Sequence, residues 1–427
     1  MIRLFVVALF LLLPHSLLAD LPAYLKKPSD YKWAPVSTAQ VNECRIQLLR
    51  LTSQVWQGIT WEHDLLVIVP PEAQPGQPVF ITNTGGSANP KHYPMLSLIA
   101  RQVKVPCAFL FQIPNQPLFD GKKEDALIAE TFVRYLETGD ESWPLLFPMV
   151  RSVVRAMDAL QEWGAENLGA KPGKFILTGA SKRGWTTWLT AASDPRLVAI
   201  VPMVIDVLNT PAQMKHQTEC YGAPSEQIVD YTNRGLIPSP DTERARRLWA
   251  MTDPWSFRSQ YTMPKLIVLG TNDPYWTVDA LNIYWDDLPA AKWISYTPNA
   301  GHDLKETGGR PMRALNASAA FVRHIVSGQP MPDIAWKHTT AENGSAVLTV
   351  TAHPAPRQAR VWKTTAPGSD FRPSKWLSEP IDTVGPLTAK QDAPATGSAA
   401  FYVELQYLID DIEYNLCTQM RVLKAPR

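Results

Sequence analysis

Ser181 lies where a short apolar run gives way to a helix-like stretch over 185–192. A serine at such a strand-to-helix turn projects its hydroxyl above the edge of a sheet, as the nucleophile does in the Gly-x-Ser-x-Gly motif. Here Gly179 precedes the serine as usual, but the second glycine is Gly184, one place late, with Arg183 in its slot. The pattern predicts a nucleophilic serine. The alternative is a serine that only caps the following helix.

A nucleophilic serine needs a base to take its proton and an acid to orient that base. In hydrolases with this turn, the acid and then the histidine follow the serine along the chain. Asp273 and His302 each stand in a turn directly after a short apolar run. We therefore predict a triad of Ser181, Asp273 and His302. Asp206, at the end of the preceding apolar run, is the alternative acid.

The negative oxygen formed by attack on a carbonyl needs hydrogen-bond donors, which together form an oxyanion hole. The first predicted donor is the backbone amide of Lys182, at the positive end of the following helix. The second is expected from Gly85 and Gly86, where paired glycines let free amides approach a ligand; a plain turn is the alternative. The side chains of Lys182 and Arg183 either favour an anionic substrate or pair with local acids.

The segment 207–263 is long, polar and rich in proline, and it separates two predicted core strands. Connections of this length are usually lids or inserted caps. The segment 118–146 looks like a second insertion. We expect the substrate, a small molecule or a peptide, to contact residues from these insertions and from the turns near the triad: Arg183, Trp185, Trp249 and Trp276. This chemistry implies no cofactor.

Seven short apolar runs, each bounded by turn residues, alternate with helix-like segments such as 147–163. This alternation is typical of an α/β fold with a mainly parallel sheet. Because the runs are continuously apolar, we expect helices on both faces of the sheet. The runs are 65–69, 79–82, 108–112, 175–178, 199–205, 266–269 and 293–296.

Beyond residue 330 the helical periodicity fades, and proline and glycine separate strand-like segments: 346–351, 359–364, 400–406 and 414–422. We predict an α/β-hydrolase domain over 20–330 with its two cap insertions. A C-terminal β-sandwich domain is predicted over 333–427.

Residues 1–19 have the layout of a secretory signal peptide: an early Arg3, an apolar run over 4–13 and a small Ala19. The run is too short to span a membrane, and no other approaches ~18 residues. Without this leader the chain has 408 residues, with 40 Lys+Arg against 40 Asp+Glu. A neutral chain without a basic block is a poor nucleic-acid binder. We expect an exported protein, periplasmic or secreted.

The four cysteines are Cys44, Cys107, Cys220 and Cys417. An even number in an exported chain allows two disulfides, and the pairing is left open. None of them forms a Cys-x-x-Cys pair or another close pair of metal ligands, so no zinc site is expected.

Further segments accompany the predicted triad: 143–150 (WPLLFPMV), 155–158 (RAMD), 179–185 (GASKRGW), 271–276 (TNDPYW), 299–302 (NAGH), and 370–372 (DFR) with Trp376. Together they resemble the PhoPQ-activated pathogenicity-related proteins over nearly the whole chain. The resemblance implies an α/β-hydrolase fold with a C-terminal β-sandwich, in exported proteins of Gram-negative bacteria and some eukaryotes. The family name reflects control by a two-component system linked to antimicrobial-peptide resistance.

A more distant resemblance is to the glucuronoyl esterases, whose serine turn also has the late glycine. In that family the residue after the serine is a cation thought to help the oxyanion, and Lys182 matches its position. The present chain has Gly-Ala-Ser-Lys where those enzymes usually have Gly-Cys-Ser-Arg.

The sequence thus predicts an exported serine hydrolase that cleaves an ester or amide through an acyl-enzyme, with a link to envelope defence. The alternative is a secreted binding or signalling protein without turnover, because the resembled family includes a eukaryotic proliferation repressor. Serine, aspartate and histidine in the expected order favour the enzyme, since a pure binder would tolerate their loss. A carbohydrate-binding role for the C-terminal region rests on fold analogy alone.

Overall fold

The computed structural model describes residues 21–426 apart from 290, 307 and 384. The predicted signal peptide lies outside these residues. Within the described part of the chain, no helix combines the length and the apolar character needed to cross a membrane. The first element is the short helix α1 (Leu21–Lys26).

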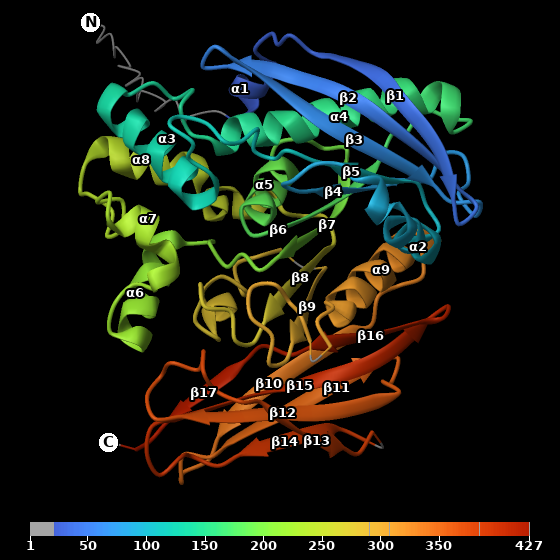
Figure 1. Ribbon diagram of the computed structural model, residues 1–427. Helices are drawn as coiled ribbons and strands as arrows, with labels where there is room; N and C mark the ends of the chain where they lie inside the picture. Colours follow the sequence, from blue (N-terminus) through green and yellow to red (C-terminus); the bar gives the residue numbers. More distant parts are fainter. Residues whose placement is uncertain (1–20, 290, 307, 384, 427) are drawn as a thin grey trace, which may run out of the picture.

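A large mixed sheet runs through the molecule (Figure 1). Its first strands pair antiparallel: β1 (Lys32–Val41), β2 (Cys44–Trp56), β3 (Ile59–Val69) and β5 (Cys107–Leu110). From β5 onward the pairing is parallel, through β4 (Val79–Asn83), β6 (Phe175–Ala180), β7 (Leu197–Met203), β8 (Lys265–Gly270) and β9 (Lys292–Thr297). The seven predicted runs overlap β3 to β9, whereas the hairpin of β1 and β2 was not predicted.

Successive residues of the central strands enter two different cores. In β3, Leu65 lies in one core and the next residue, Leu66, lies in the other. The first core is covered by α4 (Leu146–Asn167) and α5 (Lys182–Ala191), and the second by α2 (Tyr93–Val103) and α9 (Met312–Ser327) (Figure 1). Burial on both faces is the physical reason for continuously apolar strands.

The segments 118–146 and 207–263 form helices that gather on one side of the molecule, at the left of Figure 1. They are α3 (Glu124–Thr138), α6 (Thr210–Tyr221), α7 (Val229–Thr232) and α8 (Glu243–Thr252). Phe132 of α3 contacts the rings of Tyr231 and Trp249 from the second segment and Trp185 of α5, with centroids 5.9–6.5 Å apart. This aromatic contact joins the two segments to the first turn of α5.

The C-terminal region contains strands and turns throughout its described residues. Three strands form a separate sheet: β10 (Asp333–Thr340), β11 (Ala346–His353) and β14 (Leu387–Gln391). The others extend the main sheet: β12 (Gln358–Ala366), β13 (Leu377–Ile381), β15 (Ser398–Ile409), β16 (Ile412–Cys417) and β17 (Arg421–Lys424). The extension passes through one residue pair, Cys417 with Ile294 of β9. All four cysteines are free.

Candidate active site

Ser181 occupies the turn between β6 and α5 with φ 57° and ψ −124°. L-residues rarely adopt such a backbone, which costs about 1–3 kcal/mol unless neighbouring bonds hold it. Here the amide of Ser181 donates to the carbonyl of Met203, and its carbonyl accepts from the amide of Trp185, each at 2.9 Å. The Ser181 side chain makes no capping hydrogen bond to α5. The backbone therefore makes a sharp strand-to-helix turn, and the serine side chain does not serve as a helix cap.

The second glycine of the serine turn, Gly184, stands at a position that has no room for a side chain. A Cβ at this position would lie 2.6 Å from Cγ2 of Ile205 and 3.0 Å from the carbonyl oxygen of Gly179. Gly179 is equally confined, because its Cβ would lie 2.4 Å from Nδ2 of Asn83. The first turn of α5 can therefore pack directly against the ends of β6 and β7, and this packing fixes Ser181.

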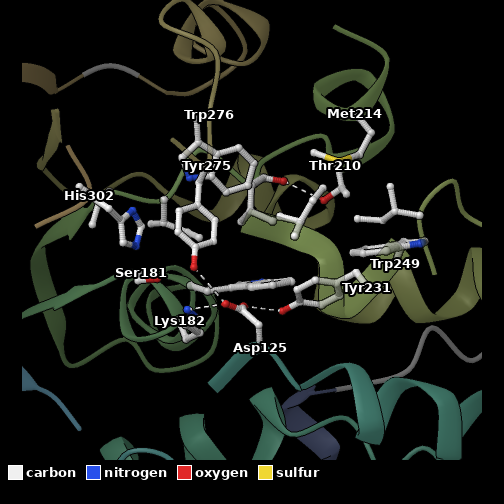
Figure 2. A pocket seen from close by; sticks show the side chains of 16 residues that line it. Asp125, Ser181, Lys182, Thr210, Met214, Tyr231, Trp249, Tyr275, Trp276 and His302 are labelled. Atoms are coloured by element: carbon white, nitrogen blue, oxygen red, sulfur yellow. Dashed lines mark hydrogen bonds and ion pairs between the residues drawn. The ribbon is translucent and has the colours of Figure 1, made fainter. Parts of the chain in front are cut away.

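Asp273 and His302 meet at the carboxyl ends of β8 and β9. Nδ1 of His302 lies 2.8 Å from Oδ2 of Asp273, whose other oxygen accepts from the amide of Tyr275 at 2.9 Å. The His302 ring stacks on Tyr275, with centroids 4.3 Å apart. Nε2 of His302 is buried and has no hydrogen-bond partner among the described residues. Ser181 and His302 line the same cavity (Figure 2).

Asp206, the alternative acid, has a different partner. Its carboxylate accepts a 2.5 Å hydrogen bond from the Tyr284 hydroxyl. Burial raises the pKa of Asp206 to about 7, and the nearby charge of Asp273 adds to this effect. The acid that contacts His302 is therefore Asp273, whereas Asp206 is buried and bonds Tyr284.

Both cations next to the serine pair with acids from the start of α3. Nζ of Lys182 lies 2.6 Å from Oδ2 of Asp125. Arg183 binds Glu124 with two hydrogen bonds, of 2.6 and 2.8 Å. The two cations were predicted either to favour an anionic substrate or to pair with local acids, and the structure shows the ion pairs. Arg183 lies outside the cavity lining, although it was expected to contact substrate.

Asp125 connects three polar side chains of the cavity, a role that was not predicted from the sequence. Besides Lys182, it accepts hydrogen bonds from the hydroxyls of Tyr231, at 3.0 Å, and Tyr275, at 3.3 Å (Figure 2). Tyr275 stands two residues after Asp273 in the TNDPYW motif, so its sequence position could have indicated that it lies near the predicted acid. Asp125 carries no such local signal.

The cavity beside Ser181 is small and mainly apolar, with a volume of about 50 Å³. Trp185, Trp249 and Trp276, which were predicted to contact substrate, are among its lining residues. Gly85 and Gly86 are outside its lining. Gly85 lies instead against the Arg183 side chain, since a Cβ there would be 2.6 Å from Nη2. Through Arg183 the glycine turn is still next to the serine turn.

A segment of the C-terminal region supports two loops: the acid loop, which follows β8 and carries Asp273, and the histidine loop, which follows β9 and carries His302. Asn272 donates from Nδ2 to the carbonyl of Ser374, at 2.6 Å. Asn299 donates to the carbonyl of Trp376 at 3.0 Å and accepts from the Trp376 amide at 2.7 Å. The two loops are also joined by the amide of Asn272, which donates to the carbonyl of Ala300 at 3.0 Å. Both loops therefore rest on the backbone of residues 374–376.

The sheet order, the covering helices and the serine turn define an α/β-hydrolase fold. Among solved structures, the chain is similar to an acetyl xylan esterase from Paenibacillus sp. R4, with a TM-score of 0.52 and 15% identity. That likeness covers 71% of this chain and 91% of the esterase. A glucuronoyl esterase from Solibacter usitatus has a TM-score of 0.44 at 11% identity, over 67% of this chain and 88% of that one.

Residues 21–372 match the family described as PhoPQ-activated pathogenicity-related protein, and the chain belongs to this family. It is also 32% identical, over 473 aligned positions, to the autocrine proliferation repressor protein A of Dictyostelium discoideum. The alignment covers all of this chain and 94% of that protein. The expected family and the α/β-hydrolase fold are thus confirmed.

Replacing Gly184 by alanine tests the packing of the serine turn. We expect Gly184→Ala to lower the free energy of unfolding by about 1–3 kcal/mol, because the added methyl group overpacks the contact with Ile205. Urea unfolding measures the change. Gly173→Ala is the matched control, since nothing lies within 4 Å of its Cβ, and it should change stability by less than about 0.5 kcal/mol. Equal effects of the two variants would contradict the packing argument.

Asp206 should make folding stability depend on pH. Its pKa is raised from 3.8 to about 7 in the folded protein, so the folded state keeps a proton that the unfolded chain releases. The stabilisation is complete below about pH 4 and is lost as pH rises through 7. Relative to Asp206→Asn, the wild type should lose up to about 4 kcal/mol over this range, at about 1.4 kcal/mol per pKa unit. Urea unfolding at several pH values measures it. If the free energy of unfolding depends on pH in the same way in the wild type and in Asp206→Asn, the effect is ruled out. The control is Asp333→Asn, at an exposed position, which should show the same pH dependence as the wild type.

Proposed function

We propose that this protein is a serine hydrolase that cleaves an ester through an acyl-enzyme. Ser181 attacks the carbonyl carbon, and Nε2 of His302 takes the hydroxyl proton and then gives it to the leaving group. Asp273 holds the Nδ1 proton of His302 and stabilises the imidazolium that forms. The observation that carries the proposal is that Ser181, with its positive φ, lines the same cavity as His302, whose Nδ1 contacts Asp273.

The amide of Lys182 is the proposed first oxyanion donor, because the first amides of a helix have no partner within the helix. The ion pair of Lys182 with Asp125 holds the residue in place. The second donor is proposed in the turn of Gly85 and Gly86, which contacts Arg183. The substrate contacts proposed for Trp185, Trp249 and Trp276 follow from their place in the cavity wall.

The small cavity favours a short acyl group. Drug-sized ligands occupy pockets of about 300–1,000 Å³, and a volume of about 50 Å³ suits a group of a few atoms such as acetyl. The name of one structural relative, an acetyl xylan esterase, agrees with this choice. An amide of a short acyl group is the second substrate class to test.

We further propose that the protein is exported, to the periplasm or beyond, with a role in envelope defence. The leader-like residues 1–19 and the family support this location.

The division into a hydrolase domain over 20–330 and a C-terminal β-sandwich domain is likewise a proposal. The two sheets of the C-terminal region support the second domain.

A binding or signalling protein without turnover is the second candidate function. The similarity to a protein named autocrine proliferation repressor protein A favours it. A fluorophosphonate probe distinguishes the two candidates, because it labels only an activated serine.

The wild type should react with the fluorophosphonate, and Ser181→Ala should not, as read by intact mass. The wild type should hydrolyse p-nitrophenyl acetate faster than the octanoate ester. Asp273→Asn should lower kcat by about 10³–10⁴-fold because it loses the charge that orients His302. Asp206→Asn is the matched control and should stay within about tenfold of the wild type. A folded wild type that neither reacts with the probe nor hydrolyses either ester would contradict the enzyme and favour the binding protein.

Asn299 should act on catalysis through the position of His302. Asn299→Ala removes both hydrogen bonds to Trp376, and a small shift of the loop costs rate. We expect kcat for the acetate ester to fall about 10- to 100-fold with little change in KM. Asn282→Ala is the control, because Asn282 also bonds the C-terminal region, donating to the Met420 carbonyl at 2.8 Å, but lies outside both loops. Equal losses in the two variants would mean that the effect is general destabilisation.

A further inference from the structure

Three potential metal ligands meet beside the loop that carries Asp273. His216 and Cys220 are one turn apart on the same face of α6, and Asp279 comes from the connection between β8 and β9, directly before the short 3-10 helix Ala280–Ile283. Nε2 of His216 lies 2.7 Å from Oδ1 of Asp279 and 3.7 Å from Sγ of Cys220. No two of the three ligand atoms are more than 4.8 Å apart.

These distances are close to those around a single zinc ion. With zinc–ligand bonds of about 2.0–2.3 Å, ligand atoms in a tetrahedral site stand about 3.3–3.8 Å apart. The 3.7 Å between Nε2 of His216 and Sγ of Cys220 lies in this range, although Sγ is almost as near to Nδ1, at 3.9 Å. For zinc to bind, the contact of His216 with Asp279 must open by less than about 1 Å, and the imidazole must rotate so that Nε2 points at the ion. All three side chains are partly exposed, so an ion can enter and a water molecule can complete the tetrahedron.

The donor types select the metal. A thiolate and an imidazole favour zinc and similar transition metals over magnesium or calcium, which prefer oxygen ligands. A thiolate and a carboxylate together also neutralise the two charges of the ion. No zinc site was predicted from the sequence, because no two of the cysteines are close along the chain. The His-x-x-x-Cys spacing on a helix and the distant Asp279 did not stand out.

We propose that His216, Cys220 and Asp279 bind a zinc ion with water as the fourth ligand. Binding forms one bond from zinc to Nε2 of His216, one to Sγ of Cys220 and one to Oδ1 of Asp279. The thiol proton, and any proton shared by His216 and Asp279, leaves to solvent. No electrons are transferred.

The ion would fasten α6 to the loop that follows the catalytic acid. Side chains of α6 already bond the backbone of that loop. Gln217 donates to the carbonyl of Tyr275 and Tyr221 to that of Trp276, each at 2.7 Å. Met214 on the same helix lines the cavity (Figure 2). Zinc therefore joins a wall of the substrate cavity to the acid loop, independently of whether Ser181 is a nucleophile.

Calorimetric titration of the chelator-treated full chain with zinc chloride tests the site. We expect one equivalent to bind and to raise Tm. Affinity should fall at least about 100-fold in Cys220→Ser and in His216→Gln. His92→Gln, at an exposed histidine before α2, should bind like the wild type. No binding, or equal affinity in all variants, would overturn the proposal.

Alkylation of the wild type tests the site without a variant. Cys220 is partly exposed, whereas the other three cysteines are buried, so iodoacetamide should modify Cys220 first. One equivalent of zinc should slow this modification at least about tenfold, as read by peptide mass. An unchanged rate at a zinc concentration that saturates the calorimetric signal would show that the ion binds elsewhere, for example at His302, and would overturn the assignment.

Discussion

The backbone of Ser181 is the constraint on which the rest of the site depends. A positive φ at a serine persists only where neighbouring bonds over-determine it. Here β7 supplies the carbonyl of Met203, α5 supplies the amide of Trp185, and two glycines allow the helix to approach the strands. The central sheet is thus the support that fixes one side chain, and the helices on its two faces keep that support rigid.

Charge around the serine turn is balanced locally. Two cations follow the serine in sequence, and two acids open α3, so each cation has its own partner. Because Asp125 also accepts from two tyrosine hydroxyls, the polar side of the cavity is a connected set rather than separate contacts. A partly buried charge of this kind is stable only while it stays paired. The helix α3 is therefore part of the electrostatics of the site as well as part of its cover.

The sequence predicted the central strands and the contact of Asp273 with His302, because apolar runs mark where parallel strands end. It could not predict that Asp125 would reach Lys182, since contact between distant segments leaves no local pattern. Arg183 illustrates the same limit: its place beside the serine was readable, but its binding to Glu124 depends on how α3 packs. The β1–β2 hairpin was missed because β1 is largely exposed and has no apolar run.

The contacts of Asn272 and Asn299 with residues 374–376 involve main-chain groups of the C-terminal region. Main-chain groups are present whatever the side chains are, so these bonds constrain the path of the segment and leave its composition largely free. A C-terminal region of different sequence could replace this one if its chain followed the same course past the two loops. Cutting the protein at residue 330, by contrast, would remove the surface on which the acid and histidine loops rest.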